Sequence, residues 1–379
     1  MAPLDGIRVV ELTTMITGPL AGMLLADLGA SVIKIENPDQ GDPFRSFRGG
    51  LYGGHFISYN RNKRSLAIDL RSDAGKTAFL ALIRRSDILI DNFRQGVLDR
   101  LSLPSSHLMG INPRLIHASI TGFGAGGPYQ SRPAYDAVAQ ALSGMSAQFL
   151  DPQNPQVQGP TLSDNITGFY AAYAVLAALF ERERTGKGRR IETNMLESTI
   201  AFAPDAFTNF KRYGTKVAPS TRAAVSQSYA VTCSDGRMIA VHLSSQPKFW
   251  EGLIKAIQRP DLFSNLLFSA RENRIANYQS LGIELRKTFV QKPRDEWARR
   301  LEAEDVPFAP VLDVEEVIAD PQVQHLGTFY NSTHPQEGEV WGIHPPVLFD
   351  GERLGMPAPP PTLGEHSKEI LDELQIEGQ

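Results

Sequence analysis

The sequence has almost no cysteine and no long hydrophobic run. Its 379 residues include one cysteine, Cys233, so an internal disulfide and a thiolate metal site are excluded and a reducing compartment is expected. The longest apolar stretch, residues 169–180, is interrupted by tyrosines and is too short to cross a bilayer. No basic segment followed by an apolar run marks a secretory signal near Met1. The sequence therefore predicts a cytoplasmic protein without a membrane partner.

An excess of charge of either sign is also absent. Against 42 Asp and Glu stand 38 Lys and Arg, which gives a formal net charge of −4. This balance offers no large attraction to nucleic acid or to an anionic membrane, so neither is an expected partner. With 42% hydrophobic and 21% charged residues, the composition is typical of folded globular proteins. The length favours two domains, or one large α/β unit with an insertion.

Apolar strands and helices alternate through the first half of the chain. Residues 7–12 are β-branched and apolar, Pro19 suits a first helical turn, and Gly29 suits a left-handed helix end before a second apolar run at 31–36. The order then recurs, with further strands expected at 65–70, 88–91, 115–121 and 190–194, and helices at 73–85, opened by an acidic cap, and 165–184. This alternation predicts an α/β fold with a doubly wound, Rossmann-like parallel sheet and helices on both faces.

The pattern changes in the second half. Residues 228–232 and 238–242 flank a turn and predict an antiparallel hairpin. Helical stretches follow at 246–257, 270–289 and 294–304, and a proline-rich tether at 357–361 precedes a short helix at 367–374. We therefore expect a large domain at 1–200, a linker at 201–224, a small α+β domain at 225–315 and a C-terminal segment at 316–379.

Several familiar motifs are incomplete or lack the secondary structure that they need around them. The glycines of 122–127 fit a dinucleotide spacing, but Pro128 and Pro133 stand where a helix should begin, which favours a flexible loop. A nucleotide-dependent dehydrogenase stays open as an alternative that would need this loop. The histidines show no metal-ligand spacing and no Gly-x-Ser-x-Gly elbow occurs, so no metal and no serine-hydrolase chemistry is expected. Asp164, directly before an apolar helix, by itself predicts a helix cap.

Blocks along nearly the whole chain resemble the class III CoA-transferase family, which includes formyl-CoA transferase and the carnitine CoA-transferases. Near the N-terminus they are Pro3-Leu-Asp-Gly-Ile7, Gly18-Pro19 and residues 28–36. The other blocks follow in the same order and spacing, at 41–42, 62–65, 91–93, 96–100, 122–128, 135–136, 177–182, 185–188, 306–307, 310–311, 320–321 and 363–366. The related α-methylacyl-CoA racemases share part of this pattern.

The resemblance implies an architecture and a reaction. The subunit would have a Rossmann-like large domain and a small domain, the C-terminal segment would return to the large one, and two subunits would interlock as a homodimer. The family's nucleophile falls on Asp164, whose carboxylate would attack an acyl-CoA thioester and pass through a mixed anhydride and an aspartyl-CoA thioester. CoA and acyl-CoA would be substrates, and no metal or permanently bound cofactor is implied.

The resemblance also places the substrate contacts. CoA contacts fall on residues spread along the large domain: Ile16, Thr17, Ile68, Arg71, Asn92, Phe93 and Arg100. Phe93 would pack on the adenine while Arg71 and Arg100 face phosphates. Tyr135 and Asp136 correspond to residues that line the acyl pocket.

Departures from the family bear on the substrate. Formyl-CoA transferase has glutamine at the position of Ile16 and arginine at that of Asn37, which disfavours formate and oxalate here. The racemases have a histidine where this chain has Tyr135, so a two-base racemase is the less favoured alternative. A non-catalytic CoA-binding protein would not need Asp164. We expect succinyl-CoA as the donor and a small dicarboxylate as the acceptor. Arg45, Arg48 and Arg222 are the candidates to bind the second carboxylate.

Overall fold

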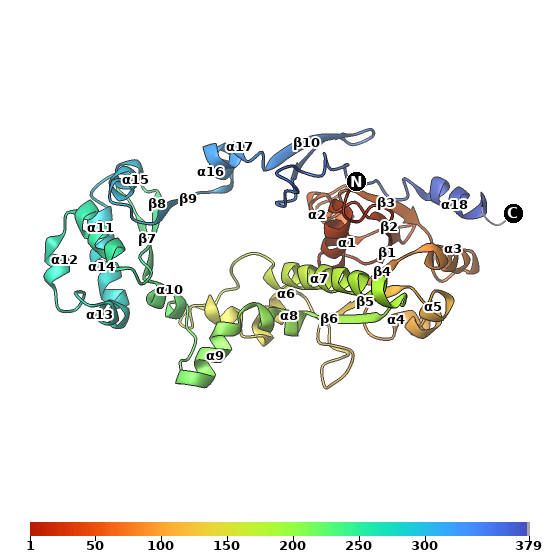
Figure 1. Cartoon of the computed structure of the whole chain (residues 1–379), viewed down its shortest axis with the longest axis horizontal. Coiled ribbons are helices and arrows are strands. Elements are labelled where there is room, and N and C mark those ends of the chain that lie inside the picture. Colours follow the sequence, from red (N-terminus) through yellow and green to blue (C-terminus); the bar gives the residue numbers. More distant parts are fainter. Residues whose placement is uncertain (377–379) are drawn as a thin grey trace. The chain divides into compact units, whose positions relative to one another are not determined.

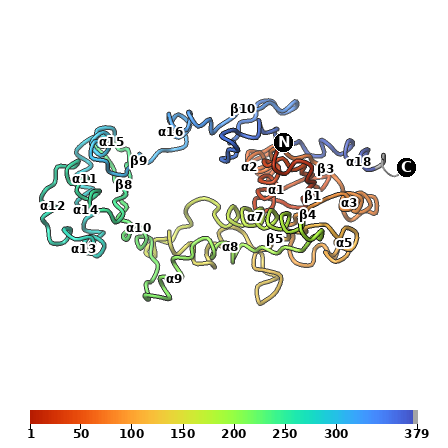
Figure 2. Tube along the Cα trace, in the orientation of Figure 1, coloured from red at the N-terminus to blue at the C-terminus, as the bar shows by residue number. Residues whose placement is uncertain are grey.

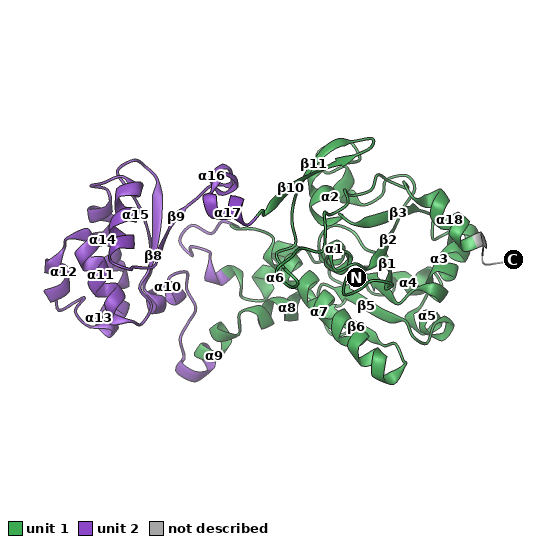
Figure 3. Ribbon diagram, turned by 45° about the horizontal axis from the view of Figure 1, so that its top comes forward, with its two compact units in different colours: residues 1–146, 157–209, 327–379 green, residues 147–156, 210–326 purple. Residues whose placement is uncertain are grey.

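The computed structural model describes residues 1–376, which form two compact units (Figure 3). Unit 1 comprises residues 1–146, 157–209 and 327–379, and unit 2 comprises residues 147–156 and 210–326. Every residue to which the sequence assigned catalysis or CoA binding lies in unit 1.

Unit 1 is built on a six-stranded parallel sheet with the order β3-β2-β1-β4-β5-β6. The strands are β1 (Arg8–Leu12), β2 (Ser31–Glu36), β3 (Lys63–Ala67), β4 (Ile88–Asp91), β5 (Ile116–Thr121) and β6 (Arg190–Asn194). The chain runs outward from β1 in both directions, so the strand order reverses between β1 and β4. In open parallel sheets such a reversal leaves a crevice at the carboxyl ends of the strands, where ligands bind.

Helices cover both faces of this sheet (Figure 1). On one face, α1 (Thr17–Asp27) and α7 (Leu162–Thr185) pack on Val9 and Ile90. The opposite face carries α3 (Asp73–Arg85), α5 (Ser105–Ile111) and α18 (Ser367–Ile376), packed on Val10 and Leu89. The predicted α/β class with a doubly wound parallel sheet is confirmed, because helices pack on both faces of a parallel sheet.

The remaining elements of unit 1 are short. The helices are α2 (Gly54–Tyr59), α4 (Val97–Arg100), α6 (Asp136–Leu142) and α8 (Met195–Phe202), and η1 (Pro43–Arg45) is a 3-10 turn. A separate antiparallel pair is formed by β10 (Phe329–His334) and β11 (Gly338–Ile343). The helix α9 (Pro204–Tyr213) and the 3-10 turn η2 (Ser146–Gln148) each begin in unit 1 and end in unit 2.

The C-terminal segment returns to the sheet beside the edge strand β3 (Figure 2). The His366 backbone N–H donates to the Ser65 carbonyl at 3.1 Å, and the Ala67 N–H donates to Ser367 Oγ at 3.0 Å. The Gly364 N–H donates to Ser65 Oγ at 2.9 Å. These bonds partner the backbone of an edge strand that would otherwise be open to another chain.

Two local predictions from sequence were wrong. Ser72, and not an acidic residue, caps α3: its Oγ accepts the Gly75 N–H at 3.0 Å, while Asp73 lies in the first turn. The single helix expected at 270–289 is two helices, α13 (Arg271–Ala276) and α14 (Tyr278–Phe289). Between them the Asn277 side chain donates to backbone carbonyls, and such local bonds compete with a continuous helix.

Unit 2 combines a three-stranded antiparallel sheet with helices. Its strands are β7 (Ser228–Thr232), β8 (Met238–His242) and β9 (Phe308–Val311), in the order β7-β8-β9, which confirms the predicted hairpin. The helices are α10 (Thr221–Ser226), α11 (Pro247–Ile257), α12 (Pro260–Ser264), α13, α14, α15 (Arg294–Ala303), α16 (Val314–Ala319) and α17 (Pro321–His325). Trp250, Phe289 and Trp297 are at the centre of its core.

Charged side chains are buried between the sheet and the segment around η1. Glu11 Oε1 lies 3.0 Å from Lys34 Nζ, and Glu11 Oε2 lies 2.9 Å from Lys63 Nζ. Lys34 Nζ also lies 3.0 Å from Asp42. Burial alone would raise the pKa of Glu11, but the charges of Lys63 and Lys34 hold it below its ordinary value. Burial dominates at Lys63 and lowers its pKa to about 8.

Glu11 is thus the carboxylate shared by two buried lysines, and its neutralisation should destabilise unit 1. For Glu11→Gln we expect a loss of about 3–5 kcal/mol in the free energy of unfolding, because two buried ammonium groups lose a counter-charge. Urea unfolding followed by circular dichroism measures it. Glu373→Gln, in an exposed pair with Arg64, is the matched control and should change stability far less. Equal effects in the two variants would contradict the assignment.

Candidate active site

The carboxyl ends of the parallel strands bring the predicted site residues to one edge of the sheet. Segments that follow β1, β3, β4 and β5 carry Ile16, Thr17, Ile68, Arg71, Asn92, Phe93, Arg100, Tyr135 and Asp136. Helix α7 connects β5 to β6, so it begins at this same edge and runs back across the sheet. Asp164, in the first turn of α7, therefore lies on the side of the sheet where ligands bind in this class of fold.

The turn between β1 and α1 is held from two sides. Met15 has a left-handed backbone with φ of 67°, and its N–H donates to both carboxylate oxygens of Asp42 at 3.2 Å. Directly after β4, Asn92 Oδ1 accepts the Thr14 N–H at 3.0 Å, and Asn92 Nδ2 donates to the Thr14 carbonyl at 2.8 Å. Asn92 Nδ2 also lies 3.1 Å from Thr17 Oγ1. These bonds fix an unfavourable backbone conformation at the strand-order reversal.

Helix α7 comes very close to this turn because it has a glycine at the point of contact. A Cβ on Gly168 would lie 2.8 Å from the Thr17 carbonyl oxygen and 3.0 Å from the Leu20 side chain. Asp164 is one helical turn before Gly168, on the same face of α7. The glycine thus allows the first turn of α7, with its carboxylate, to approach the turn that Asn92 holds.

Asp164 and Asp136 face each other. The Asp164 backbone N–H donates to Asp136 Oδ1 at 3.2 Å, and Gln140 Nε2 donates to Asp136 Oδ2 at 2.5 Å. Burial and, secondarily, the charge of Asp136 raise the pKa of Asp164 to about 7. The carboxyl group is consequently poised between its acid and its carboxylate near neutral pH. The helix cap that the sequence predicts at Asp164 is wrong, because the N-cap of α7 is Thr161 and Asp164 lies in the first turn.

The cationic residues lie apart from this centre. Arg71 is exposed, and its guanidinium is paired with Asp69 at 2.9 Å. Arg100 is exposed on α4. Strands spaced by about 4.8 Å place the ends of β3 and β4 about 14 Å apart. Phe93, which directly follows Asn92 in the chain, is half-buried. Its backbone N–H donates to Asp91 Oδ1 at 3.2 Å.

Two predicted substrate contacts are buried in the protein interior. Ile16 packs with Phe44 and Phe56, so its side chain is part of a small core. Arg45 is fully buried, pairs with Glu36 at 2.8 Å and lies 3.6 Å from the centre of the Phe56 ring. Arg45 is therefore not available to a substrate carboxylate, contrary to the expectation from sequence. Ile68 contributes a backbone bond to the Glu36 carbonyl, and Tyr135 is exposed at the start of α6.

Some residues that shape this edge have no clear signal in the sequence. Asp42, Met15 and Gln140 had no assigned role, yet the first two shape the β1–α1 turn and the third holds Asp136. The spacing of four between Asp136 and Gln140 on a helix was the one available signal. The bond between Asp42 and Met15 joins residues 27 positions apart and had no local signature.

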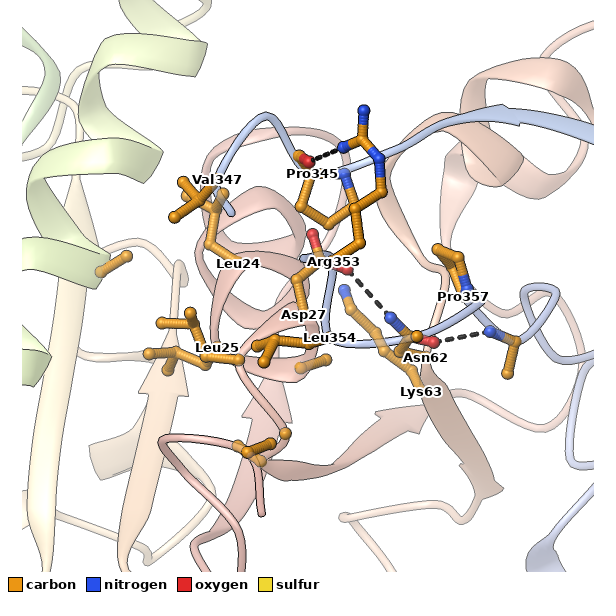
Figure 4. Close-up of a pocket in the computed structure, with 18 of the residues that line it drawn as sticks. Leu24, Leu25, Asp27, Asn62, Lys63, Pro345, Val347, Arg353, Leu354 and Pro357 are labelled. Atoms are coloured by element: carbon orange, nitrogen blue, oxygen red, sulfur yellow. Dashed lines mark hydrogen bonds between the residues drawn. The ribbon is translucent and has the colours of Figure 1, made fainter. Parts of the chain in front are cut away.

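A separate apolar cavity of about 650 Å³ lies along α1 and α7. It is lined by Leu24, Phe169, Tyr173 and, from the returning C-terminal segment, Val347 and Leu354, among others. Figure 4 shows Asp27 and Asn62 at its polar end, where Asn62 Nδ2 donates to Asp27 at 2.9 Å. Asp164 is not among the lining residues, so the cavity is distinct from the candidate catalytic carboxylate.

Within residues 1–376, no helix combines the length and the hydrophobicity needed to cross a membrane. The same residues contain no group of three or more His, Cys, Asp or Glu side chains placed to hold a metal ion.

Comparisons with known proteins agree over nearly the whole chain. The model of CoA-transferase family III matches residues 4–367. The chain is 32% identical to the succinyl-CoA:glutarate CoA-transferase of Homo sapiens, covering 98% of this chain and 86% of that protein. It is 36% identical to the acetyl-CoA:oxalate CoA-transferase of Acetobacter aceti, covering 84% and 83%.

A solved structure gives the same result. The crystal structure of a CAIB/BAIF family protein from Brucella suis superposes with a TM-score of 0.87 at 32% identity, covering 98% of this chain and 99% of that one. The family suggested by the sequence blocks is thereby confirmed. The chain belongs to CoA-transferase family III and is an acyl-CoA:carboxylate CoA-transferase.

Proposed function

We propose that this enzyme moves CoA from an acyl-CoA to a carboxylic acid by covalent catalysis on Asp164. The observation that carries the proposal is the position of this half-buried carboxylate, at the start of α7 and beside the turn held by Asn92. A group so placed lies where the thioester of a CoA bound along the carboxyl edge would reach. The resemblance to the family assigns the same residue.

The reaction has two halves: CoA passes from the donor acyl group to Asp164, and then from Asp164 to the acceptor acid. The Asp164 carboxylate attacks the donor carbonyl carbon, the C–S bond breaks, and a mixed anhydride and CoA thiolate form. The thiolate then attacks the aspartyl carbonyl, releasing the donor acid and leaving an aspartyl-CoA thioester. The acceptor carboxylate attacks the aspartyl carbonyl of this thioester, the C–S bond breaks, and a second mixed anhydride and CoA thiolate form. The thiolate then attacks the acceptor acyl carbonyl of that anhydride, which gives the new acyl-CoA and frees the Asp164 carboxylate. The exchange as a whole replaces one acyl-CoA thioester by another of comparable energy, and covalent intermediates on Asp164 divide it into easier steps.

For CoA we propose a path along the carboxyl edge of the sheet. Phe93 is half-buried and follows β4, where its ring can pack on the adenine. The exposed guanidinium groups of Arg71 and Arg100 reach the phosphates, while Thr17 and Asn92 border the pantetheine end. Backbone N–H groups of the glycine loop 122–127 supply donors to the oxyanion that develops on the thioester. In this scheme residues 1–200 form the CoA-binding domain, and no metal or resident cofactor takes part.

For the substrate pair we propose a succinyl donor and a small dicarboxylic acceptor. The human relative is named for succinyl-CoA and glutarate, and the Acetobacter relative for acetyl-CoA and oxalate. Asp136, held by Gln140, and Tyr135 border the acyl group. With Arg45 buried, Arg48 is the remaining candidate within unit 1 for the second carboxylate, while Arg222 lies in unit 2.

Replacing the nucleophile should remove the covalent intermediate. For Asp164→Asn we expect transfer to fall by at least about 10³-fold, because no carboxylate remains to carry the acyl group. Incubation with succinyl-CoA followed by hydroxylamine should convert Asp164 of the wild type to a hydroxamate, detected by mass spectrometry of the peptide. The variant should give none. Asp73→Asn, in the first turn of α3, is the matched control and should label as the wild type does.

Failure of labelling would have a specific meaning. If Asp164 is not modified by any acyl-CoA, but the α-proton of a bound CoA ester exchanges with deuterated water, the racemase alternative replaces the transferase. Unchanged transfer in Asp164→Asn would exclude the aspartyl mechanism altogether.

The raised pKa of Asp164 predicts an acid limb in the rate profile. The attacking form is the carboxylate, so kcat/KM should fall below pH 7, and a group with a pKa near 7 is about one tenth ionised at pH 6. Removing the neighbouring charge in Asp136→Asn should lower the pKa of Asp164 and move the limb to lower pH. Initial rates from pH 5 to 9 measure both. A limb that moves upward in the variant would contradict the assigned cause.

We propose that a second copy of the chain covers the apolar face of α7, as the interlocked homodimer of the family implies. Phe169, Tyr173 and Phe180 are 58%, 69% and 68% exposed and share one face of the helix at spacings of four and seven. This face continues into the apolar cavity. Such exposure is unusual for a monomer.

The dimer makes a prediction about mass in solution. The wild type should sediment as a dimer, and Tyr173→Glu should shift it to the 41.7 kDa monomer, because a carboxylate would be buried in an apolar contact. Ala74→Glu, which adds the same charge on exposed α3, should leave the dimer intact. A wild type that sediments as a monomer at all concentrations would refute the proposal.

A further inference from the structure

Three polar side chains form a buried row beneath the corner that follows β4. His117, in β5, has its Nε2 2.8 Å from Asp91 Oδ2 and its Nδ1 2.8 Å from Ser105 Oγ. Asp91 ends β4 and Ser105 begins α5. The three residues are 1%, 3% and 9% exposed, in the order His117, Asp91 and Ser105. None of them is assigned a role by the transfer mechanism.

The hydrogen-bond roles in the row follow from its chemistry. A carboxylate only accepts, so His117 carries its proton on Nε2 and donates it to Asp91. The Nδ1 atom then accepts the Ser105 hydroxyl proton. With this tautomer, both ring nitrogens have partners, as buried polar atoms require.

These are the residue types of a serine-hydrolase triad, but the surroundings exclude that chemistry. The polar cavity beside Ser105 and His117 has a volume of only about 40 Å³. Ligand pockets measure about 300–1,000 Å³, so this cavity has room for water but not for a thioester. An acyl-CoA thioester cannot reach the Ser105 oxygen, so the row must act on the protein itself.

The row ends on the corner proposed to bind CoA. Asp91 Oδ1 accepts the Phe93 N–H at 3.2 Å, while its other oxygen is held by His117. Asn92, which lies between Asp91 and Phe93 in the chain, makes the bonds to Thr14 and Thr17 that hold the β1–α1 turn. The buried Asp91 carboxylate thus holds the backbone of Phe93, the residue that directly follows Asn92.

We propose that His117 is a positioning residue of the CoA site, which fixes the Asp91 carboxylate and through it the Asn92–Phe93 corner. This inference rests on the proposed CoA contacts of Asn92 and Phe93. Without the Nε2–H donor, Asp91 Oδ2 is left buried without its partner and the carboxylate turns toward other donors or water. The Phe93 N–H then loses its acceptor, and the adenine platform loses its fixed position.

The test is direct CoA binding by titration calorimetry, with the full-length protein and CoA itself as the probe. His117→Leu should raise the Kd for CoA about tenfold or more, a loss of about 1.4 kcal/mol per tenfold. In steady state, the KM for the acyl-CoA should rise while the KM for the acceptor acid stays near that of the wild type. His117→Gln, whose Nε2 can still donate to Asp91, should recover most of the CoA affinity.

A control separates positioning from general destabilisation. Leu108, on the same helix as Ser105, is fully buried in the neighbouring core, and Leu108→Ala should lower the melting temperature without changing the Kd for CoA. If Leu108→Ala weakens CoA binding as much as His117→Leu, or if His117→Leu binds CoA as the wild type does, the inference is overturned. If the wild type itself binds no CoA, the proposed function fails instead.

Discussion

The contact between Asp42 and the Met15 backbone is the constraint on which the rest of the site depends. A left-handed conformation at a residue with a long side chain is unfavourable, and it persists because Asp42 accepts the Met15 N–H with both oxygens. Lys34, which is buried, holds Asp42 in turn. The turn that results is close enough to α7 for only a glycine, Gly168, to fit between them. The position of Asp164 follows from this packing.

Two carboxyl groups of unit 1, the buried Glu11 and the half-buried Asp164, have pKa values shifted in opposite directions, and their neighbours explain the difference. Glu11 is shared between Lys34 and Lys63, which hold its pKa low, so it stays charged and structural. Asp164 has Asp136 beside it, so burial and like charge raise its pKa to about 7, and within residues 1–376 no cation offsets them. A carboxylate without a counter-ion is a better nucleophile than one in a salt bridge, at a cost in stability at neutral pH. Perturbed groups of this kind concentrate at functional sites.

Much of the fold was predictable because it depends on residue patterns within short stretches of the sequence. The alternation of apolar strands with helices gave the parallel sheet, and Gly29, with φ of 100°, ends α1 as expected. Errors arose where two local signals competed. Ser72 and Asp73 both suit a helix start, and the Asn277 side chain divides a stretch with continuous helical character. The prediction that Arg45 contacts substrate was wrong, because the tertiary structure buries Arg45 in an ion pair with Glu36.

The sequence by itself determined the class of fold, the family and the identity of the candidate nucleophile, because strand periodicity and ordered motif blocks are properties of the chain. It did not determine which of those residues act together. The bonds of Asn92 to Thr14 span 78 positions, and those of His117 to Asp91 span 26. Hydrogen bonds and desolvation depend on distances of a few ångströms in space, which separation along the chain does not specify. The pairing of β4 with β5 decided the bond of His117 to Asp91, and the contact of the segment after β4 with the β1–α1 turn decided the bonds of Asn92.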